Sequence, residues 1–463
     1  MRLNTFKWVI FAVTSLGNFI SMLDFSAVNI ALYKISAAFA LPVSTIQWIM
    51  LAYQIVLTSL LIFFGRLGDM VNRRKLYTYG FLIFGIGAVL SYFSSGFIML
   101  LIARIIQGAG GAVLIANSFA IVSSIFKGKQ RGKALGFLGA ITHLAGMTAP
   151  ALGGFLTEAF SWRAVFLPSV FLSFPAMILS AKIIPAKRVS EKTPIDVFGT
   201  LLLTACIASV LFVIAQAPVK GMWTAQTAEI ITVSIVCLLV FILYENKTPA
   251  PLVDFKLFAS PVFLFCNLAL MMSYLAMYPN TILFPFYSQG VLGNTASLTG
   301  VLILPFSLFY LITAIVTGTL PAPKKMPVGM MLLAAGLFLF SRTTTATAAY
   351  LLVLMQIVMG VGNALFQPSV NTAILNASPK DGTGMASGIL SLSRNTGIAM
   401  GSVVSVGLFE MRQTALLSQS VSEKTALLSS YHFALICGIG FAFLCLTFIM
   451  IAVLSSKKRK SDV

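Results

Sequence analysis

Three ionisable residues interrupt the long apolar stretches of this sequence: Asp24, Arg104 and Arg394. A charged side chain at the centre of a membrane helix costs about 2.5–3.5 kcal/mol of insertion free energy, so such residues usually pair or take part in function. Asp24 is the only carboxylate expected deep inside an apolar segment. A carboxylate at that depth can hold a proton or a polar group of a substrate, which indicates ion or substrate binding within a membrane.

Asp24 and Arg104 are expected at similar depth. Asp24 lies about nine residues before the end of one apolar segment, and Arg104 about seven residues after the start of another. At 1.5 Å per residue, these spacings put them roughly 14 Å and 10 Å from one membrane face. Two interpretations stay open at this point. The two residues form a static pair that orients two helices, or protonation of Asp24 competes with substrate and drives the transport cycle.

Other polar residues on the apolar segments are candidate substrate contacts. Arg394 either faces an anionic or polar part of a cargo molecule or bonds backbone carbonyls. The other candidates are Tyr53, Gln54, His143, Gln367 and Asn371. Side chains of these types also commonly make hydrogen bonds between helices.

Neither a metal site nor a cofactor is expected. The five cysteines all lie within apolar segments, and both histidines are isolated from a second ligand. A phosphate-binding loop of the G-x-x-x-x-G-K-[ST] type is absent from the sequence, so an ion gradient is the expected energy source.

Composition identifies lipid as the solvent for much of the surface. Of the 463 residues, 58% are apolar and 9% are charged, whereas soluble proteins carry about 25% charged residues. This excludes soluble enzymes and nucleic-acid binders. Twenty-three of the 31 Lys and Arg residues lie between apolar segments on one side of the expected membrane. This positive-inside pattern accounts for the net charge of +19 and predicts that both termini are cytoplasmic, in a multi-pass protein of the cell membrane.

Fourteen apolar segments are long enough to be considered membrane-spanning helices. The sequence therefore predicts an all-α membrane protein with a six-helix bundle (1–183), two extra helices (184–260) and a second six-helix bundle (261–463). A short Gly65-Arg66-Leu67 motif has a weak counterpart in Gly318-Thr319-Leu320. Such a repeat is typical of secondary transporters. The segments are 8–33, 44–65, 76–94, 97–122, 134–157, 162–183, 197–216, 226–244, 261–286, 297–318, 327–341, 346–374, 384–408 and 430–455.

Four motifs carry a resemblance to a known family. They are Gly65-Arg66-Leu67-Gly68-Asp69-Met70-Val71-Asn72-Arg73-Arg74, Arg104-Ile105-Ile106-Gln107-Gly108-Ala109-Gly110-Gly111-Ala112, Ala149-Pro150-Ala151-Leu152-Gly153-Gly154, and the segment from Leu23 to Leu32. Together they resemble the signatures of the fourteen-helix drug:proton antiporter family of the major facilitator superfamily. The resemblance implies the major facilitator fold with fourteen membrane-spanning helices. It also implies that the protein is a proton-coupled antiporter that exports hydrophobic, drug-like compounds. The alternative is an exporter or flippase of an endogenous amphiphile, such as a lipid, siderophore or metabolite.

The resemblance also implies residue roles. Asp24 and Arg104 would couple to protons, and Pro150, Gly153 and Gly154 would form the antiporter motif. The loop residues Gly65, Gly68, Asp69, Arg73 and Arg74 would form a conformational latch. The expected partners are a small hydrophobic substrate, protons and the bilayer, with no nucleic acid and a monomeric chain. A membrane-embedded transferase would need paired catalytic acids or a histidine constellation, which the sequence lacks, so no enzyme activity is expected.

Two departures from the family pattern matter. Asn72 stands where the family usually has glycine, and because Asn tolerates positive φ better than other non-glycine residues, the turn is expected to survive. The last six segments contain no obvious acidic residue at mid-depth, which argues against export of dications.

Overall fold

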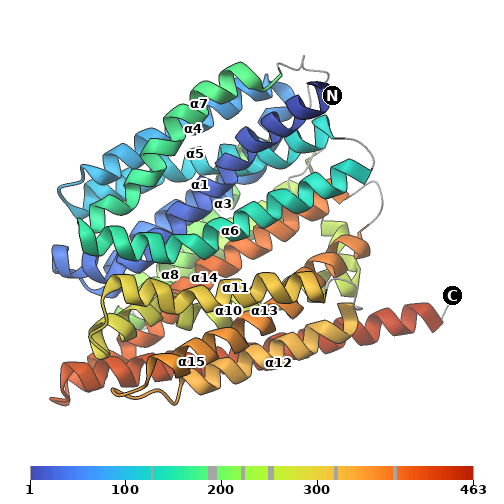
Figure 1. Ribbon diagram of the computed structural model, residues 1–463. Coiled ribbons are helices and arrows are strands. Elements are labelled where there is room, and N and C mark those ends of the chain that lie inside the picture. The colour runs from blue at the N-terminus through green and yellow to red at the C-terminus, as the bar shows by residue number, and fades with distance from the viewer. Residues whose placement is uncertain are drawn as a thin grey trace. The chain divides into compact units, whose positions relative to one another are not determined.

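The computed structural model describes residues 2–126, 129–185, 196–220, 225–248, 255–317, 322–378 and 383–461, and its regular elements there are helices (Figure 1). Each of the fourteen expected apolar segments overlaps one long helix. These are α1 (Arg2–Phe39), α3 (Trp48–Met70), α4 (Arg73–Tyr92), α5 (Phe97–Ile125), α6 (Lys129–Ala159), α7 (Leu167–Ile183), α8 (Val197–Lys220), α9 (Ala225–Glu245), α10 (Pro261–Phe286), α11 (Ala296–Val316), α12 (Ala322–Phe340), α13 (Ala349–Ala377), α14 (Thr383–Leu417) and α15 (Glu423–Ser461).

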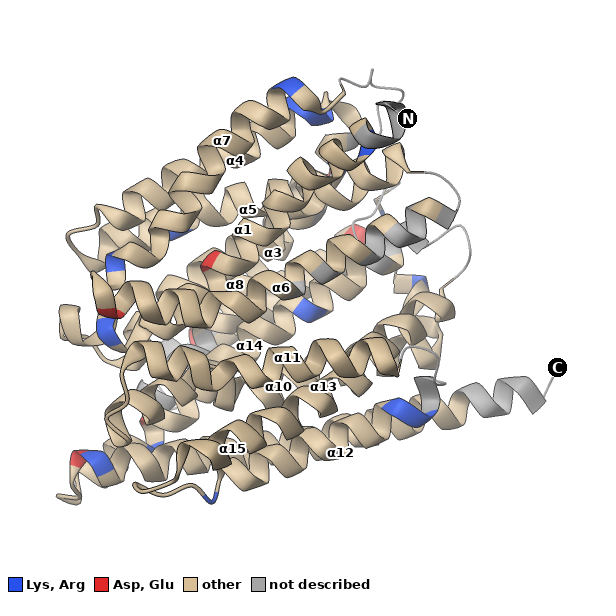
Figure 2. Cartoon of the chain, viewed as in Figure 1, with Lys and Arg blue, Asp and Glu red and all other residues tan. Residues whose placement is uncertain are grey.

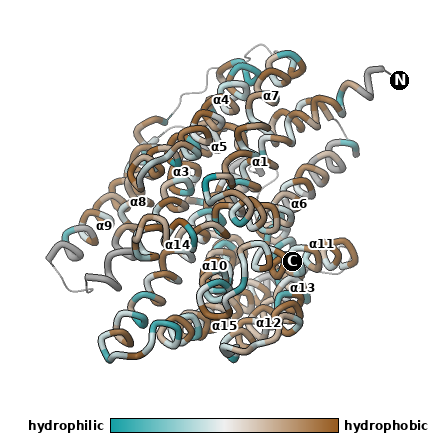
Figure 3. Tube along the Cα trace, turned by 60° about the vertical axis from the view of Figure 1, so that its left-hand side comes forward, coloured by the Kyte–Doolittle hydropathy of each residue, from teal (hydrophilic) through white to brown (hydrophobic). Residues whose placement is uncertain are grey.

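The surface of these helices suits lipid. In the described part of the chain, eight helical stretches are long and apolar enough to cross a membrane. Figure 3 shows hydrophobic residues along most of the helical lengths, and Figure 2 shows the charged residues mainly toward the helix ends. Ile98, Phe171 and Ile315 are 63%, 70% and 73% exposed. Aqueous exposure of side chains this large would be unfavourable, so the protein is a multi-pass membrane protein.

The chain divides into two compact units. The first comprises Met1–Ala205 with Ala296–Gly300, and the second comprises Cys206–Thr295 with Val301–Val463. In the first unit, α1 packs against α5, α6 and α7, and α4 packs against α5 and α7. In the second unit, α10 packs against α13, α14 and α15, and α12 packs against α13 and α15. The predicted three-part division at residues 183 and 260 stays a prediction.

The two units therefore repeat one packing scheme, in which α1, α4, α5, α6 and α7 correspond to α10, α12, α13, α14 and α15. Glycines mark equivalent close approaches. A Cβ added to Gly110 of α5 would collide with the backbone of α4, and one added to Gly362 of α13 would lie 2.7 Å from the Leu333 backbone nitrogen of α12. The expected Gly318-Thr319-Leu320 counterpart lies outside the described residues, so the helix packing carries the repeat.

The expected end of one helix is wrong. Helix α14 continues to Leu417 instead of ending near residue 408, so Glu410 is a buried helical residue and not part of a loop. Helix α12 ends at Phe340, within one residue of its expected end at 341, and the Ser/Thr run that follows forms turns. The side chains of this run bond locally instead: the Ser341 and Thr343 hydroxyls donate to backbone carbonyls three residues earlier. Such local bonds compete with a continued helix.

The glycine contacts predict that alanine substitutions have different effects on stability at crowded and at open positions. Gly110→Ala and Gly362→Ala should each lower the melting temperature of the purified protein in detergent, because the added methyl groups meet backbone atoms that cannot move independently. Gly139→Ala and Gly388→Ala have open space at the new Cβ. These two controls should leave the melting temperature unchanged or raise it, because alanine favours helix by about 1 kcal/mol over glycine. Equal effects at all four positions would contradict the packing argument.

Candidate functional site

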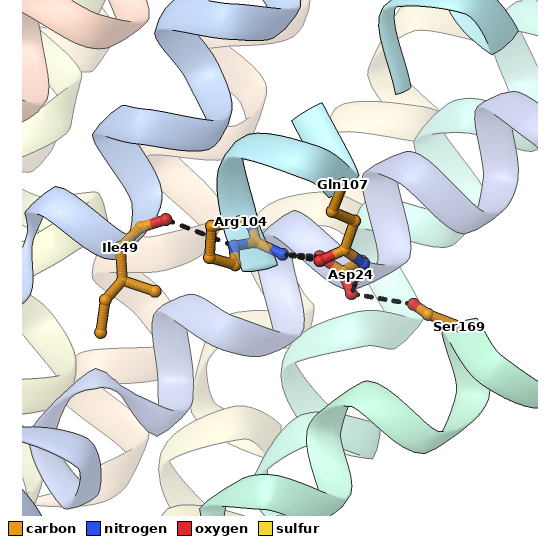
Figure 4. A network of polar contacts seen from close by, with 5 residues as sticks. All are labelled: Asp24, Ile49, Arg104, Gln107 and Ser169. Atoms are coloured by element: carbon orange, nitrogen blue, oxygen red, sulfur yellow. Dashed lines mark hydrogen bonds and ion pairs between the residues drawn. The ribbon is translucent and has the colours of Figure 1, made fainter. Parts of the chain in front are cut away.

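Asp24 of α1 accepts hydrogen bonds from two other helices of the first unit (Figure 4). Its Oδ2 lies 2.5 Å from Nη1 of Arg104 on α5. Its Oδ1 accepts from Gln107 Nε2 of α5 at 2.8 Å and from Ser169 Oγ of α7 at 2.9 Å. All four side chains are completely buried. The expected proximity of Asp24 and Arg104 is therefore confirmed, while their role in proton coupling stays a prediction.

Arg104 contacts groups on three helices of the first unit. Its Nε donates to the Ile49 carbonyl oxygen of α3 at 3.3 Å, and its Nη1 also donates to Gln107 Oε1 at 2.6 Å. The Tyr53 ring of α3 lies under the guanidinium, with 4.4 Å from Cζ to the ring centroid. Its Nη2 has no hydrogen-bond partner. The guanidinium thus joins α1, α3 and α5, and among the described residues Asp24 is the carboxylate that balances its charge.

The energetics of this pair are those of a buried ion pair. Removing two charges from water costs several kcal/mol per ion, and their mutual attraction offsets this only when both are well hydrogen-bonded. Neutralising one partner leaves the other charge uncompensated. The arrangement therefore has two chemically distinct states. With Asp24 ionised, the carboxylate ties α1 to α5 and α7; with Asp24 protonated, the positive charge of Arg104 has lost its partner.

Sequence reasoning missed Gln107 and Ser169 as members of the site. Gln107 stands three residues after Arg104, a spacing that places both on one face of α5, and this signal was available. Ser169 follows Leu167-Pro168 at the start of α7 and carries no recognisable pattern. Its recruitment depends on how α7 packs against α1, which is a tertiary contact.

The second unit joins the corresponding three helices without charge. Asn280 of α10 donates through Nδ2 to Met359 Sδ of α13 at 3.5 Å, and its Oδ1 accepts from the Tyr431 hydroxyl of α15 at 2.6 Å. Met359 follows the start of α13 by the same interval as Gln107 follows the start of α5. The two units thus share a polar contact among three helices, but only the first contains an ion pair there.

The loop between α3 and α4 is fastened by several polar contacts. Arg73 Nε donates to the Gly68 carbonyl oxygen at 2.9 Å, and Asn117 Nδ2 of α5 donates to the Phe64 carbonyl oxygen at 3.2 Å. A Cβ on Gly68 would collide with the Asn117 amide, so glycine is needed for this approach. The Asp69 side chain lies outside the described residues, and Gly65 has open space around it. The latch role of these residues stays a prediction.

Asn72 corrects the expectation about this turn. Its φ is −64°, so the position does not need the positive φ that glycine or asparagine tolerates. Instead, its side-chain Oδ1 accepts from the backbone N–H of Arg74 at 3.0 Å and caps the start of α4. Asparagine is among the best N-cap residues because its oxygen pairs with an otherwise unbonded helix N–H.

The antiporter motif lies where α6 meets close neighbours in the first unit. A Cβ on Gly153 would lie 2.8 Å from the Ala27 Cα of α1, and one on Gly154 would collide with the Ala296 carbonyl oxygen. Pro150 lies within α6, where it removes one backbone donor. The small residues therefore allow close backbone approach.

The expected substrate contacts fall into two groups. Tyr53 and Gln54 are buried in the first unit; Tyr53 packs on Arg104, and Gln54 Nε2 lies 3.5 Å from Thr58 Oγ1. The His143 side chain lies outside the described residues. Gln367, Asn371 and Arg394 belong to the second unit. Gln367 donates to the Tyr274 hydroxyl, a partner that sequence reasoning did not find.

Other buried carboxylates and metal ligands do not form a competing site. Besides Asp24, the described residues bury Asp196, Glu245 and Glu410. Asp196 caps α8, where its Oδ1 accepts from the Gly199 N–H at 2.7 Å. Among the described residues, no three His, Cys, Asp or Glu side chains lie close enough together to hold a metal ion.

Comparisons with known proteins agree on a transporter. The family profile described as Major Facilitator Superfamily matches residues 14–402. The riboflavin transporter RibZ of Clostridioides difficile (strain 630) is 29% identical over 413 residues, which cover 88% of this chain and 89% of RibZ. The multidrug resistance protein Stp of Mycobacterium tuberculosis (strain CDC 1551 / Oshkosh) is 28% identical over 84% of this chain and 74% of Stp.

The fold also matches solved transporter structures. A bacterial homolog of the human lysosomal transporter Spinster superimposes with a TM-score of 0.69 at 13% identity, covering 98% of each chain. At this level of identity, the likeness concerns the fold alone.

The buried pair generates a prediction for a double-mutant cycle. Arg104→Met should destabilise the protein by about 3–5 kcal/mol, because it leaves the Asp24 carboxylate buried without its countercharge. The double variant with Asp24→Asn should lose less than the sum of the two single variants. Unfolding of purified protein in detergent measures each free energy.

A second cycle serves as the control. Arg163 bonds the Ser94 carbonyl oxygen through Nε and Nη2 at 3.1 and 2.9 Å and faces no carboxylate in these contacts. Arg163→Met combined with Asp24→Asn should therefore be additive. Additivity in both cycles would show that Asp24 and Arg104 do not stabilise each other.

Proposed function

This chain belongs to the Major Facilitator Superfamily, and we propose that it is a proton-coupled antiporter that exports hydrophobic, drug-like molecules across the cell membrane. Its relatives are transporters rather than enzymes, and they include a multidrug resistance protein. The observation that carries the proposal is the fully buried Asp24–Arg104 pair in the first unit. A carboxylate whose ionisation decides whether three helices are tied together is suited to link proton binding to helix movement.

The proposed step begins with a proton that binds to Asp24. The carboxylate then loses its negative charge, and its attraction for Arg104 falls. Gln107 and Ser169 both donate to Oδ1, so a neutral carboxyl group keeps these acceptor contacts only if its proton lies on Oδ2, facing the guanidinium. That proton would meet the Nη1 donor of Arg104. The contact between Oδ2 and Arg104 must then open. Of the Asp24 contacts with α5, the Gln107 hydrogen bond remains, so α1 is held to α5 more weakly.

Membrane topology belongs to the same proposal. We infer fourteen membrane-spanning helices, because each expected segment overlaps one long helix of the structure. Both termini are inferred to be cytoplasmic, because 23 of the 31 basic residues would then lie on the inner side. The proposed transporter acts as a monomer. Its two six-helix sets give the cargo site access to the two sides of the membrane in turn.

The loop and glycine motifs complete the proposed cycle. The Arg73 and Asn117 contacts support a latch, since they join the last two turns of α3 to α4 and to α5. Gly153 and Gly154 have no side chains, so this face of α6 can move along or away from a neighbouring helix without steric obstruction. Tyr53 and Gln54 are proposed to contact cargo, and Tyr53 also packs on the ion pair.

Export of an endogenous amphiphile is the second candidate. The relative RibZ is named a riboflavin transporter, which shows that a similar chain can carry a metabolite. The same proton chemistry would serve both cargoes, so the two candidates differ only in what the protein binds.

The proton-coupling proposal predicts the behaviour of Asp24→Asn. In proteoliposomes loaded with a hydrophobic fluorescent dye, an imposed pH gradient should accelerate dye transport by the natural protein. Asp24→Asn should abolish this acceleration and leave only the gradient-free rate, because asparagine cannot exchange a proton. Full gradient-driven transport by this variant would overturn the proposal.

Asp196→Asn is the matched control. It makes the same chemical change at another buried carboxylate, and asparagine caps a helix about as well as aspartate. Gradient-driven transport should persist in this variant, and its melting temperature should separate a coupling defect from misfolding.

A further inference from the structure

Arg394 is the centre of a polar aromatic cluster that lies entirely within the second unit. Tyr274 of α10 accepts a hydrogen bond from Gln367 Nε2 of α13. Arg394 of α14 lies within electrostatic range of Tyr274 and of Tyr310 of α11. Four helices therefore contribute to one cluster, hereafter the Arg394 cluster, made of Arg394, Tyr274, Tyr310 and Gln367.

Glycines on α14 bring Arg394 to this position. Gly397, three residues further along α14, would place a Cβ 3.0 Å from Met271 Cα and 3.2 Å from Tyr274 Cδ2. Gly401 would place one 2.8 Å from the Tyr274 carbonyl oxygen. Residues three or four apart share a helix face. The face of α14 that carries Arg394 therefore lies close against α10 and its tyrosines.

Arg394 differs from Arg104 in its charge balance. Arg104 is completely buried and paired with Asp24. Arg394 is partly exposed, and no carboxylate of the described residues lies within ion-pair distance of it. It stands about 11 residues into α14, roughly 16 Å along the helix axis. An uncompensated guanidinium at that depth is costly, so a ligand that supplies an acceptor would be stabilised there.

The chemistry of the cluster defines such a ligand. Guanidinium presents a planar fork of donors that matches a carboxylate or another anionic oxygen group. Tyrosine rings offer flat apolar surfaces, and the Tyr274 and Tyr278 rings already meet edge to face, with centroids 6.3 Å apart.

We propose that the Arg394 cluster is a cargo subsite that binds planar aromatic molecules through an anionic oxygen group. The guanidinium of Arg394 pairs with the anionic group, and the rings of Tyr274 and Tyr310 pack against the aromatic part. This subsite rests on the proposed function as an exporter, and it names the substrate class within it. Neutral or cationic aromatic molecules lack the group that Arg394 recognises.

Two xanthene dyes test this subsite, because they share a tricyclic ring system and differ in charge. Fluorescein is anionic at pH 8 and rhodamine 6G is cationic. Binding of each dye to full-length protein in lipid nanodiscs is measured by fluorescence polarisation. Arg394→Gln should weaken fluorescein binding by about tenfold or more and change rhodamine 6G binding by less than about twofold. Arg394→Lys should fall between the natural protein and Arg394→Gln for fluorescein, because lysine keeps the charge and loses the fork.

Control variants separate recognition from folding. Arg342→Gln removes an arginine of the second unit that lies over the Phe338 ring, with 5.0 Å from Cζ to the centroid, and it should leave both dyes unaffected. Tyr274→Phe removes only a hydroxyl and should weaken fluorescein binding by a few fold. The subsite is wrong if fluorescein does not bind the natural protein, or if folded Arg394→Gln binds it equally well. Equal weakening of both dyes would assign Arg394 to helix packing through backbone carbonyls and would also overturn the subsite.

The binding assay is independent of proton coupling. Asp24→Asn should still bind fluorescein, because Asp24 lies in the other unit. If gradient-driven transport fails in the natural protein while the Arg394 variants behave as expected, the coupling proposal is wrong and the subsite stands. The reverse result would leave the coupling proposal intact and remove the subsite.

Discussion

The structure depends on the complete burial of Asp24. A carboxylate with no exposed surface must have its charge balanced and its oxygens hydrogen-bonded, because the helices around it offer few other dipoles. Arg104, Gln107 and Ser169 meet this requirement from α5 and α7. The contacts of α1 with α5 and α7 at this point therefore depend on a carboxylate whose charge Arg104 balances. Their strength arises from desolvation, since the same contacts in water would contribute little.

The two units apply one packing scheme with different chemistry. Small residues allow α4 to approach α5, and α12 to approach α13, so the helices of both units meet at short backbone distances. A polar contact then joins three equivalent helices in each unit. In the first unit that contact is ionic, and in the second it consists of Asn280, Met359 and Tyr431. The proposed proton coupling therefore concerns the contact in the first unit, which contains the ion pair.

The two intramembrane arginines illustrate how context decides a role. Both are guanidinium groups on long apolar helices, and both lie near tyrosines. Arg104 has its countercharge within the protein, because its guanidinium pairs with Asp24. Arg394 lacks such a partner among the described residues and is partly exposed, and the proposed subsite rests on this difference. This contrast separates a group suited to conformational change from one suited to recognition.

The amino-acid sequence by itself determined the membrane environment, the helical segments and the depth of Asp24 and Arg104. These follow from local properties: apolar runs of sufficient length, a 1.5 Å rise per residue, and basic residues gathered between the runs. The sequence also determined that residues 14–402 carry a family pattern. Helix ends were less predictable, as at Glu410, because the helical conformation of α14 continues beyond its apolar run.

Only the tertiary structure decided which side chains meet. Ser169 joins Asp24 across 145 residues of chain, and Tyr274 joins Gln367 across 93. Asn72 proved to be a helix cap because of its observed φ and its bond to Arg74, neither of which follows from residue type alone. Contacts of this kind depend on how helices are rotated and packed against each other. That rotation is set by the summed packing of many small residues, which no single motif encodes.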